Sequence, residues 1–303
     1  MALTFELQTS DAISFNDFIN HASEVVKRNM PETVLDCTEQ LQKLSNNKYF
    51  LINFLNTELK EYLNFQTANV YSAQTLLLHQ TPHYYIRANA WPVMESKEVS
   101  VAKNIAKHQN ELSIYQRAHD HNFSFLTVGY FGGGYTTEIW EYDNDEVIGF
   151  IGEIINLNYL ETTKLPKGKS MFYRASKDIH IQNPSDDYSI SINVIPISDK
   201  DVEKEQYYFD VDTQMISGIV PTVGSGRHML FDLAKKFHDQ KTLDLVTSIS
   251  ENHEIPYMRL KAFDSLSTMT GESEHMWQRA SRDNHPIVHR HANLVLEGKK
   301  RSF

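Results

Sequence analysis

The middle of the chain, from about residue 68 to 220, consists of short apolar runs separated by turn residues, and this pattern limits the possible folds most. The runs are rich in Tyr, Ile, Val and Thr, and turn signals recur about every 8 to 12 residues. Two of these turns are Gly132-Gly133-Gly134 and Pro166-Lys167-Gly168. The pattern is typical of an antiparallel β-sandwich or β-barrel.

Helical spacing replaces the strand pattern on the N-terminal side. Between residues 11 and about 65, Ser14 is a candidate N-cap, and Phe15, Phe18 and Ile19 follow it on one apolar stripe. Two more segments with helical spacing follow. We therefore expect an N-terminal helical segment over residues 1–67.

Helical spacing also returns after the strand-rich region. Leu230, Leu233, Ala234 and Phe237 share one stripe. The later segments "IPYMRLKAFDSLSTMTG" and "NHPIVHRHANLVLEG" look like HEAT-type repeats, although two copies are too few to define a solenoid. The sequence thus predicts an α+β protein that ends in a helical region over residues 221–303 with two HEAT-like segments.

Charge and composition exclude several classes of partner. The formal net charge is −10, which disfavours a nucleic-acid partner because a phosphate backbone requires a basic surface. Cys37 is the single cysteine, so a disulfide framework and a cysteine-based zinc site are excluded. The N-terminus lacks the pattern of a signal peptide, and no uninterrupted apolar run is long enough for a membrane span. We expect a cytoplasmic protein without a membrane partner.

Two histidines, His119 and His121, stand one residue apart at the head of an aromatic run. In a strand, residues i and i+2 point to the same face, so the two imidazoles are expected to converge. A third ligand should come from another strand, and His180 in "KDIHIQNP" is the best candidate. Three neutral imidazoles suit divalent iron and leave coordination positions open. With 14 histidines in the chain, an ordinary surface pair is the alternative interpretation.

The stretch "HDHNFSFLTVGYFGGGYTTEIWEYD" resembles the first metal motif of the cupin superfamily, and most closely that of its cysteine-dioxygenase-like (thiol dioxygenase) branch. The stretch "GKSMFYRASKDIHIQNPSDDYSISINVI" resembles the second motif of that branch. The resemblance covers about residues 82–196. It implies a cupin jelly-roll barrel in which His119, His121 and His180 hold iron.

A further likeness lies upstream of these motifs, where "YYIRANAW" resembles the Tyr-X-Arg element of the same branch. The resemblance implies that Arg87 holds a substrate carboxylate, a role that suits the bidentate geometry of guanidinium. The final strand of the branch carries a Ser-His-Tyr relay. Ser189 matches its serine, whereas Ser191 and Asn193 replace the histidine and the tyrosine, which puts thiol oxidation in doubt.

The cupin glutamate that usually follows the second histidine is absent, because Phe125 and Leu126 occupy its place. Glu138 lies beyond the run Gly132-Gly133-Gly134. We interpret this glycine run as a hairpin turn or a lid edge. A turn centred on Gly133 would place Glu138 opposite Val128, which leaves open whether Glu138 is a ligand.

These observations predict a non-haem Fe(II)-dependent oxygenase, with another divalent metal possible and dioxygen as co-substrate. Arg87 and Ser189 are the candidate catalytic residues, and the substrate is a small anionic, amino-acid-like or thiol-bearing molecule. One alternative is a non-catalytic cupin sensor or scaffold that binds a small molecule, or a partner protein through the C-terminal helices. Another is a tailoring oxygenase that acts on a peptide or a carrier-bound substrate.

Two other groups of residues remain open to a structural or a functional interpretation. His285, His289 and His291 are better read as structural histidines of a helix than as a second metal site, because His291 lies off the face that the other two share. The alternating aromatic residues form either the core or a pocket lining: Tyr85, Tyr115, Tyr130, Tyr135 and Trp140.

Overall fold

The computed structural model describes residues 3–6, 9–60, 74–93, 115–220 and 226–299. The chain divides into two compact units. Unit 1 consists of residues 1–142 and 156–201, and unit 2 consists of residues 143–155 and 202–303.

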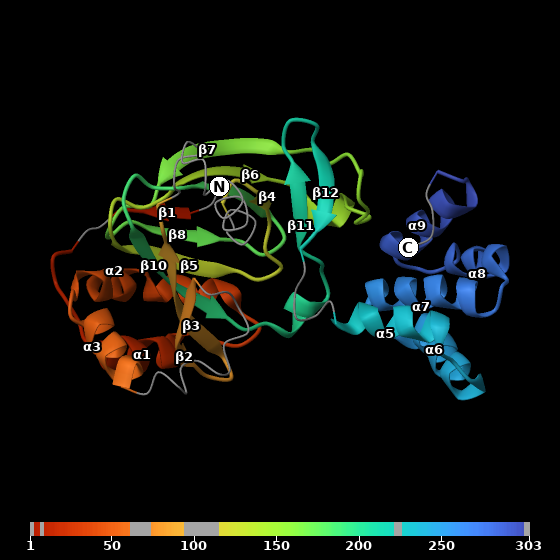
Figure 1. The fold of residues 1–303 in the computed structure, drawn as a ribbon, viewed down its shortest axis with the longest axis horizontal. Helices are drawn as coiled ribbons and strands as arrows, with labels where there is room; N and C mark the ends of the chain where they lie inside the picture. The colour runs from red at the N-terminus through yellow and green to blue at the C-terminus, as the bar shows by residue number, and fades with distance from the viewer. Residues whose placement is uncertain (1–2, 7–8, 61–73, 94–114, 221–225, 300–303) are drawn as a thin grey trace, which may run out of the picture. The chain divides into compact units, whose positions relative to one another are not determined.

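Unit 1 contains two antiparallel sheets (Figure 1). The first sheet has the order β1 (Leu3–Phe5), β8 (Ser170–Tyr173), β5 (Phe125–Phe131), β10 (Ser189–Pro196), β3 (Tyr84–Trp91), β2 (Thr75–Gln80). The strands of unit 1 in the second sheet have the order β4 (Ala118–His119), β9 (Asp178–Asn183), β6 (Thr136–Glu141), β7 (Asn158–Lys164). The chain passes from one sheet to the other between β3 and β4, and again at each of the next two connections. This strand order is that of a double-sheet jelly roll, the architecture of cupins, so the predicted α+β fold with antiparallel sheets is confirmed.

Helices cover the outer face of the first sheet (Figure 1). They are α1 (Phe15–Val25), the 3₁₀ helix η1 (Pro31–Cys37), α2 (Thr38–Asn46) and α3 (Phe50–Glu58). Ser14 caps α1 as predicted, because its side chain accepts a hydrogen bond from the Asp17 amide in a capping box. Phe18 and Leu41 of the helices are fully buried in one cluster with Ile86 of β3.

A second apolar cluster lies between the two sheets. Tyr173 and Met171 of β8, Trp91 of β3 and Phe125 of β5 pack in one cluster with Ile139 of β6. Neighbouring residues along a strand point to opposite faces, so Ile86 faces the helices while Tyr85 and Arg87 face the space between the sheets. This alternation decides which side chains can reach the three candidate ligands.

Unit 2 combines a hairpin with a set of helices. Its strands are β11 (Tyr207–Asp210) and β12 (Met215–Ile219), and the helices that follow are α5 (Gly226–Lys236), α6 (Gln240–Asn252), α7 (Pro256–Met269), α8 (Ser273–Ala280) and α9 (Pro286–Leu296). Two short 3₁₀ helices, η3 (Asn144–Glu146) and η4 (Asp199–Val202), lie near the boundaries of the units. Among the described residues, no helix combines the length and the apolar character that crossing a membrane requires.

The apolar stripe expected on α5 is buried only at one residue. Ala234 packs with Phe231 against α7, while Leu230, Leu233 and Phe237 are exposed, Phe237 to 78%. The buried face is thus offset from the stripe, because Phe231 rather than Leu230 supplies the large side chain that packs inward.

Candidate metal centre

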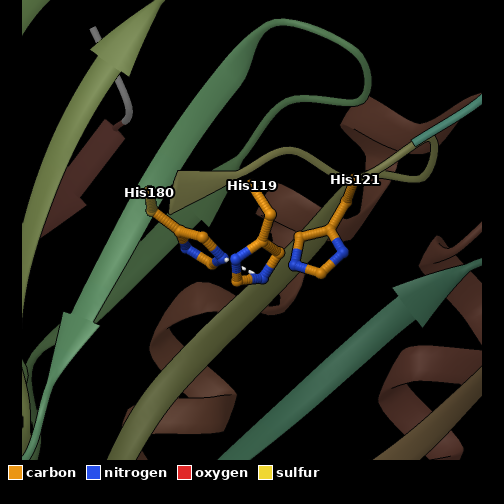
Figure 2. Close-up of side chains that lie close together, drawn as sticks. All are labelled: His119, His121 and His180. Atoms are coloured by element: carbon orange, nitrogen blue, oxygen red, sulfur yellow. Dashed lines mark hydrogen bonds between the residues drawn. The ribbon is translucent and has the colours of Figure 1, made fainter. Parts of the chain in front are cut away.

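His119, His121 and His180 come together from two segments that are distant in the sequence (Figure 2). His119 ends β4 and is the Cα partner of His180 on β9. The ring centroid of His119 lies 5.0 Å from that of His121 and 4.5 Å from that of His180. The third ring pair, His121 and His180, is separated by 5.1 Å. The sequence-based expectation that these imidazoles converge therefore agrees with the geometry of the described residues.

The spacing of the ring nitrogens suits a single cation. The Nε2 atoms of His119 and His180 lie 3.1 Å apart. Two nitrogens that each lie about 2.1 Å from one metal, at a right angle, are about 3 Å apart. One ligand atom from each of the three histidines can be chosen so that all lie within 4.8 Å of one another. The donor set therefore fits a divalent metal ion, with modest rotation of the side chains.

Burial keeps His119 and His180 in the neutral form that binds metal. His119 and His180 are exposed to only 3% and 1%. Burial lowers the pKa of His119 to about 4. The pKa of His180 is well below its usual range, chiefly because of burial and also because His119 lies next to it. Neutral imidazoles with available lone pairs are the ligands that a divalent metal requires.

A main-chain carbonyl fixes the tautomer of His119. Its Nδ1 atom lies 2.8 Å from the carbonyl oxygen of Arg117. A carbonyl can only accept, so Nδ1 carries the proton and donates it, and the lone pair resides on Nε2, which faces His180. Hydrogen bonds of this kind orient the histidine ligands of metal sites. A main-chain carbonyl has no side-chain signature, so this contact could not be predicted from the sequence.

Asp120, between the two histidines, is fully buried and does not belong to the group of potential metal ligands. The hydroxyl of Tyr142 donates a hydrogen bond to its Oδ2 atom at 2.6 Å. The His-Asp-His sequence thus contributes two imidazoles to the ligand group and a buried carboxyl group that bonds Tyr142. Tyr142 was missed in the sequence because it lies 22 residues away.

Glu138 does not belong to the histidine group. On β6, Ile139 is the partner of His180, and Glu138 is the partner of Ile181, so the carboxyl group points to the opposite face of the sheet. There it accepts a hydrogen bond from Asn183 Nδ2 at 2.8 Å. In the described part of the chain, the group of potential metal ligands therefore consists of three histidines.

The expected hairpin at the glycine run is wrong, and with it the pairing of Glu138 with Val128. β5 and β6 lie in different sheets, so the run 132–134 carries the chain from one sheet to the other. Gly132 and Gly134 have φ angles of 78° and 76°, which are strained for any residue with a side chain. A Cβ atom at Gly134 would lie 1.8 Å from the carbonyl oxygen of Leu165. Glycine is needed here for a tight crossing, and the sequence alone does not distinguish that from a hairpin.

Arg87 lies on the face of β3 that is turned to the space between the sheets. Its guanidinium carbon is 5.8 Å from the centroid of the Phe123 ring, and that ring lies 4.8 Å from the ring of His121. Arg87 pairs with Asn193 on β10, and Asn193 pairs with Thr127 on β5, so the three form a polar row across the sheet. Thr127 donates its hydroxyl to Asn193 Oδ1 at 2.6 Å.

Ser189, the other candidate catalytic residue, begins β10 and is buried. It is the partner of Trp91, and its hydroxyl donates to the main-chain oxygen of Asp187 at 3.3 Å. Ser191, two residues further along the strand, accepts a hydrogen bond from Trp91 Nε1 at 2.9 Å. Ser189 pairs with Trp91, and Trp91 lies four residues along β3 from Arg87, so Ser189 and Arg87 are on the same face of the sheet.

The histidines of α9 have separate local contacts. His285 caps the helix, because its Nδ1 accepts from the Ile287 amide at 3.3 Å. His291 is buried and stacks on Trp277, with ring centroids 5.7 Å apart. These contacts support the structural interpretation of this group.

Strand order and side chains together define a jelly-roll protein with a candidate three-histidine metal centre. No family model and no curated protein matches the chain.

Solved structures similar to this chain include dioxygenases and cupin domains. The hydroquinone 1,2-dioxygenase from Sphingomonas sp. TTNP3 with 4-hydroxybenzoate bound shares 7% identity over 46% of this chain and 81% of its own, with a TM-score of 0.27. A cupin domain from Bordetella pertussis Tohama I shares 10% identity over 42% of this chain and 98% of its own, with a TM-score of 0.23. A DMSP lyase structure shares 10% identity over 40% of this chain, with a TM-score of 0.25, and the match spans 46% of the lyase chain. Since these TM-scores are below 0.5, the jelly-roll assignment depends on the strand order.

Proposed function

We propose that this protein is a non-haem Fe(II)-dependent oxygenase in which His119, His121 and His180 hold the metal. The observation that carries the proposal is the group of three converging imidazoles, two of which are buried and have Nε2 atoms 3.1 Å apart. A set of three histidines without a carboxylate leaves coordination positions for substrate and dioxygen. When bound, the iron would supply the redox chemistry with dioxygen.

The residues around the centre would bind and orient the substrate. Phe125 and Tyr173 pack against His180, with centroids 6.3 Å and 4.7 Å away, and exclude water on that side. Arg87 would hold a carboxylate of a small anionic, amino-acid-like or thiol-bearing substrate. Asn193 continues the polar row beside Arg87, and Ser189 adds a polar group at the end of the same strand. More specifically, we propose that the site is of the thiol dioxygenase type.

The test combines metal analysis with oxygen uptake. Protein purified without added metal is expected to carry about one iron per chain and to consume oxygen with carboxylate-bearing amino acids or thiols. Protein that is folded, binds no iron after anaerobic loading with Fe(II) and consumes no oxygen would contradict the proposal.

A non-catalytic scaffold is the second candidate, and the exposed apolar residues of α5 favour it. Leu230 and Leu233 lie one turn apart on α5, Phe237 follows directly after the helix, and all three are exposed, as is typical of a helix that binds a partner protein. This function predicts that Leu230→Ser with Phe237→Ser abolishes partner binding while His119→Ala leaves it intact. The same double variant also tests the tailoring oxygenase. If it loses oxygen uptake with peptide or carrier-bound substrates but keeps it with small ones, the exposed face binds the large substrate of an oxygenase.

A further inference from the structure

A cavity of about 460 Å³ opens among the C-terminal helices of unit 2. It lies where the end of α6 and the end of α8 meet α7, which packs against both of these helices (Figure 1). Its volume is in the range of cavities that hold small molecules. None of the residues that line it belongs to the candidate metal centre, so the cavity is a separate site.

Arg259 on α7 holds the walls of this cavity together. Its Nε and Nη2 atoms donate to the two carboxylate oxygens of Asp283, at 2.7 Å and 2.8 Å. Its Nη1 atom donates to the main-chain oxygen of His253 at 2.7 Å. A bidentate pair of this kind fixes the position of both side chains. Arg259 thereby ties the connection after α6 to the connection after α8, and the cavity is formed before any ligand binds.

Two further arginines line the cavity: Arg279 in the last turn of α8 and Arg282 just after the helix. The Arg282 amide donates to the Arg279 carbonyl at 3.1 Å, so the chain still turns as in a helix between them. Residues three apart on such a turn lie on the same side. The two guanidinium groups therefore line the cavity from one side of the chain.

These two arginines share a single carboxylate. Arg279 Nη2 donates to Oε1 of Glu251 at the end of α6, and the Glu251 side chain is half exposed. Within the described residues, no carboxylate pairs with Arg282. The helix dipole stabilises one cation near the end of a helix, but two like charges three residues apart repel each other. An anion bound between the two guanidinium groups would remove that repulsion.

His253 adds an N–H donor to the wall of the cavity. Its Nδ1 atom accepts a hydrogen bond from the Ile255 amide at 3.1 Å. A neutral imidazole that accepts at Nδ1 carries its proton on Nε2. The cavity thus combines an imidazole N–H with two guanidinium groups, and all three are donors.

We propose that this cavity binds a small phosphate monoester. A carboxylate offers two oxygens, whereas the phosphate of a monoester offers three acceptor oxygens and nearly two negative charges, which suits two guanidinium groups and an imidazole N–H. Arg279, Arg282 and His253 hold the phosphate oxygens. Phe263, a buried residue of α7 that also lines the cavity, contacts the organic part of the ligand. Glu251 releases Arg279 when the ligand binds, because the carboxylate and the phosphate compete for the same guanidinium group.

The test titrates the full-length protein with phenyl phosphate at low salt in isothermal titration calorimetry, and benzoate is the carboxylate probe. Phenyl phosphate is expected to bind at one site per chain, and benzoate about tenfold more weakly. Arg282→Gln should weaken the binding of phenyl phosphate about tenfold, because it removes hydrogen bonds to a charged group. Arg290→Gln is the matched control and should leave binding unchanged, since Arg290 is exposed on α9 and lies outside the set of residues that line the cavity.

Glu251→Gln tests the competition for Arg279. Loss of the carboxylate should strengthen the binding of phenyl phosphate about threefold, which is the scale of an exposed ion pair. Glu251 and Arg282 are exposed, and thermal unfolding checks that both variants are folded.

Three results would overturn the proposal: no saturable binding of phenyl phosphate, an equal loss in Arg282→Gln and Arg290→Gln, or weaker binding in Glu251→Gln. Benzoate that binds as tightly as phenyl phosphate would overturn the assignment of the phosphate group. A phosphoserine peptide that binds more than about tenfold more tightly than phenyl phosphate would overturn the small-molecule ligand in favour of a phosphorylated protein.

Discussion

His119 and His180 are Cα partners on β4 and β9, and their Nε2 atoms face each other at 3.1 Å. Two lone pairs at this distance repel unless a proton or a cation lies between them. Since Nδ1 of His119 carries its proton toward the Arg117 carbonyl, its Nε2 is an acceptor, and a divalent ion satisfies both nitrogens.

Removal of any one of the three histidines should therefore remove the metal. His119→Ala, His121→Ala and His180→Ala are each expected to lower the bound iron to less than about a tenth of one ion per chain, because two imidazoles do not hold Fe(II) against dialysis. Elemental analysis after dialysis measures this. Glu138→Ala is the control, since Glu138 faces away, and a loss of iron in that variant would refute the three-histidine set.

Burial of His119 should make the metal-free protein sensitive to acid. The folded pKa of about 4 lies below the unfolded value of about 6.5, so the unfolded chain binds more protons between these values. The contribution is fully present above about pH 6.5 and is lost as the pH falls toward 4, by about 3 kcal/mol in all. Urea unfolding between pH 4 and 7 measures the loss, which should be smaller in His119→Gln. An equal slope in that variant would contradict the assignment.

The contact between Tyr142 and the buried Asp120 should stabilise the segment that carries the two first histidines. Tyr142→Phe removes the hydrogen bond of 2.6 Å and is expected to cost about 1 to 3 kcal/mol. The variant should also bind iron about tenfold more weakly, because the facing of His119 and His121 depends on Asp120. Urea unfolding and metal titration measure the two effects. Tyr159→Phe, whose hydroxyl bonds Thr162 at the surface, should change neither.

The histidine group could be predicted from the sequence because it depends on local rules. Alternation along a strand predicted that His119 and His121 converge, although β4 ends at His119, and a short apolar run between two turns predicted His180 on a strand. Ser14 was predictable for the same reason, since a capping box is contained within four residues.

Features that depend on which strands become neighbours could not be predicted. Glu138 faces away because β6 pairs with β9 and β7 rather than with β5, and the glycine run itself is compatible with either pairing. The Tyr142 hydroxyl acts through a contact that forms only when β4 and β6 come together in one sheet, whereas the Arg117 carbonyl acts locally but has no side-chain signature. Sheet pairing is a long-range choice, and a single sequence carries little information about it.

The crossing between the sheets gives a matched pair of variants. In Gly134→Ala, the φ of 76° and the approach of Cβ to the Leu165 carbonyl at 1.8 Å should destabilise the protein by more than about 2 kcal/mol. In Gly133→Ala, the nearest atom is Asp187 Oδ1 at 3.0 Å, which accepts from the Gly133 amide and the Ser185 hydroxyl, so the cost should be smaller, about 1 kcal/mol. Thermal and urea unfolding measure the difference, and equal costs would show that the crossing is not as tight as described.

Arg87 provides a test of how substrate binds that leaves the metal in place. Arg87→Lys keeps the charge but loses the planar pair of donors, so carboxylate-bearing substrates and inhibitors should bind about tenfold more weakly. The rise should appear in KM and in the inhibition constant more than in kcat, because Arg87 is proposed to hold the substrate rather than to react with it. Iron content should stay unchanged. Arg28→Lys, at the surface beside Asp199, is the matched control and should leave KM as it is. If Arg87→Lys alters kcat and leaves anion binding unchanged, Arg87 does not hold the carboxylate, and the face of β3 turned to the space between the sheets has a different role.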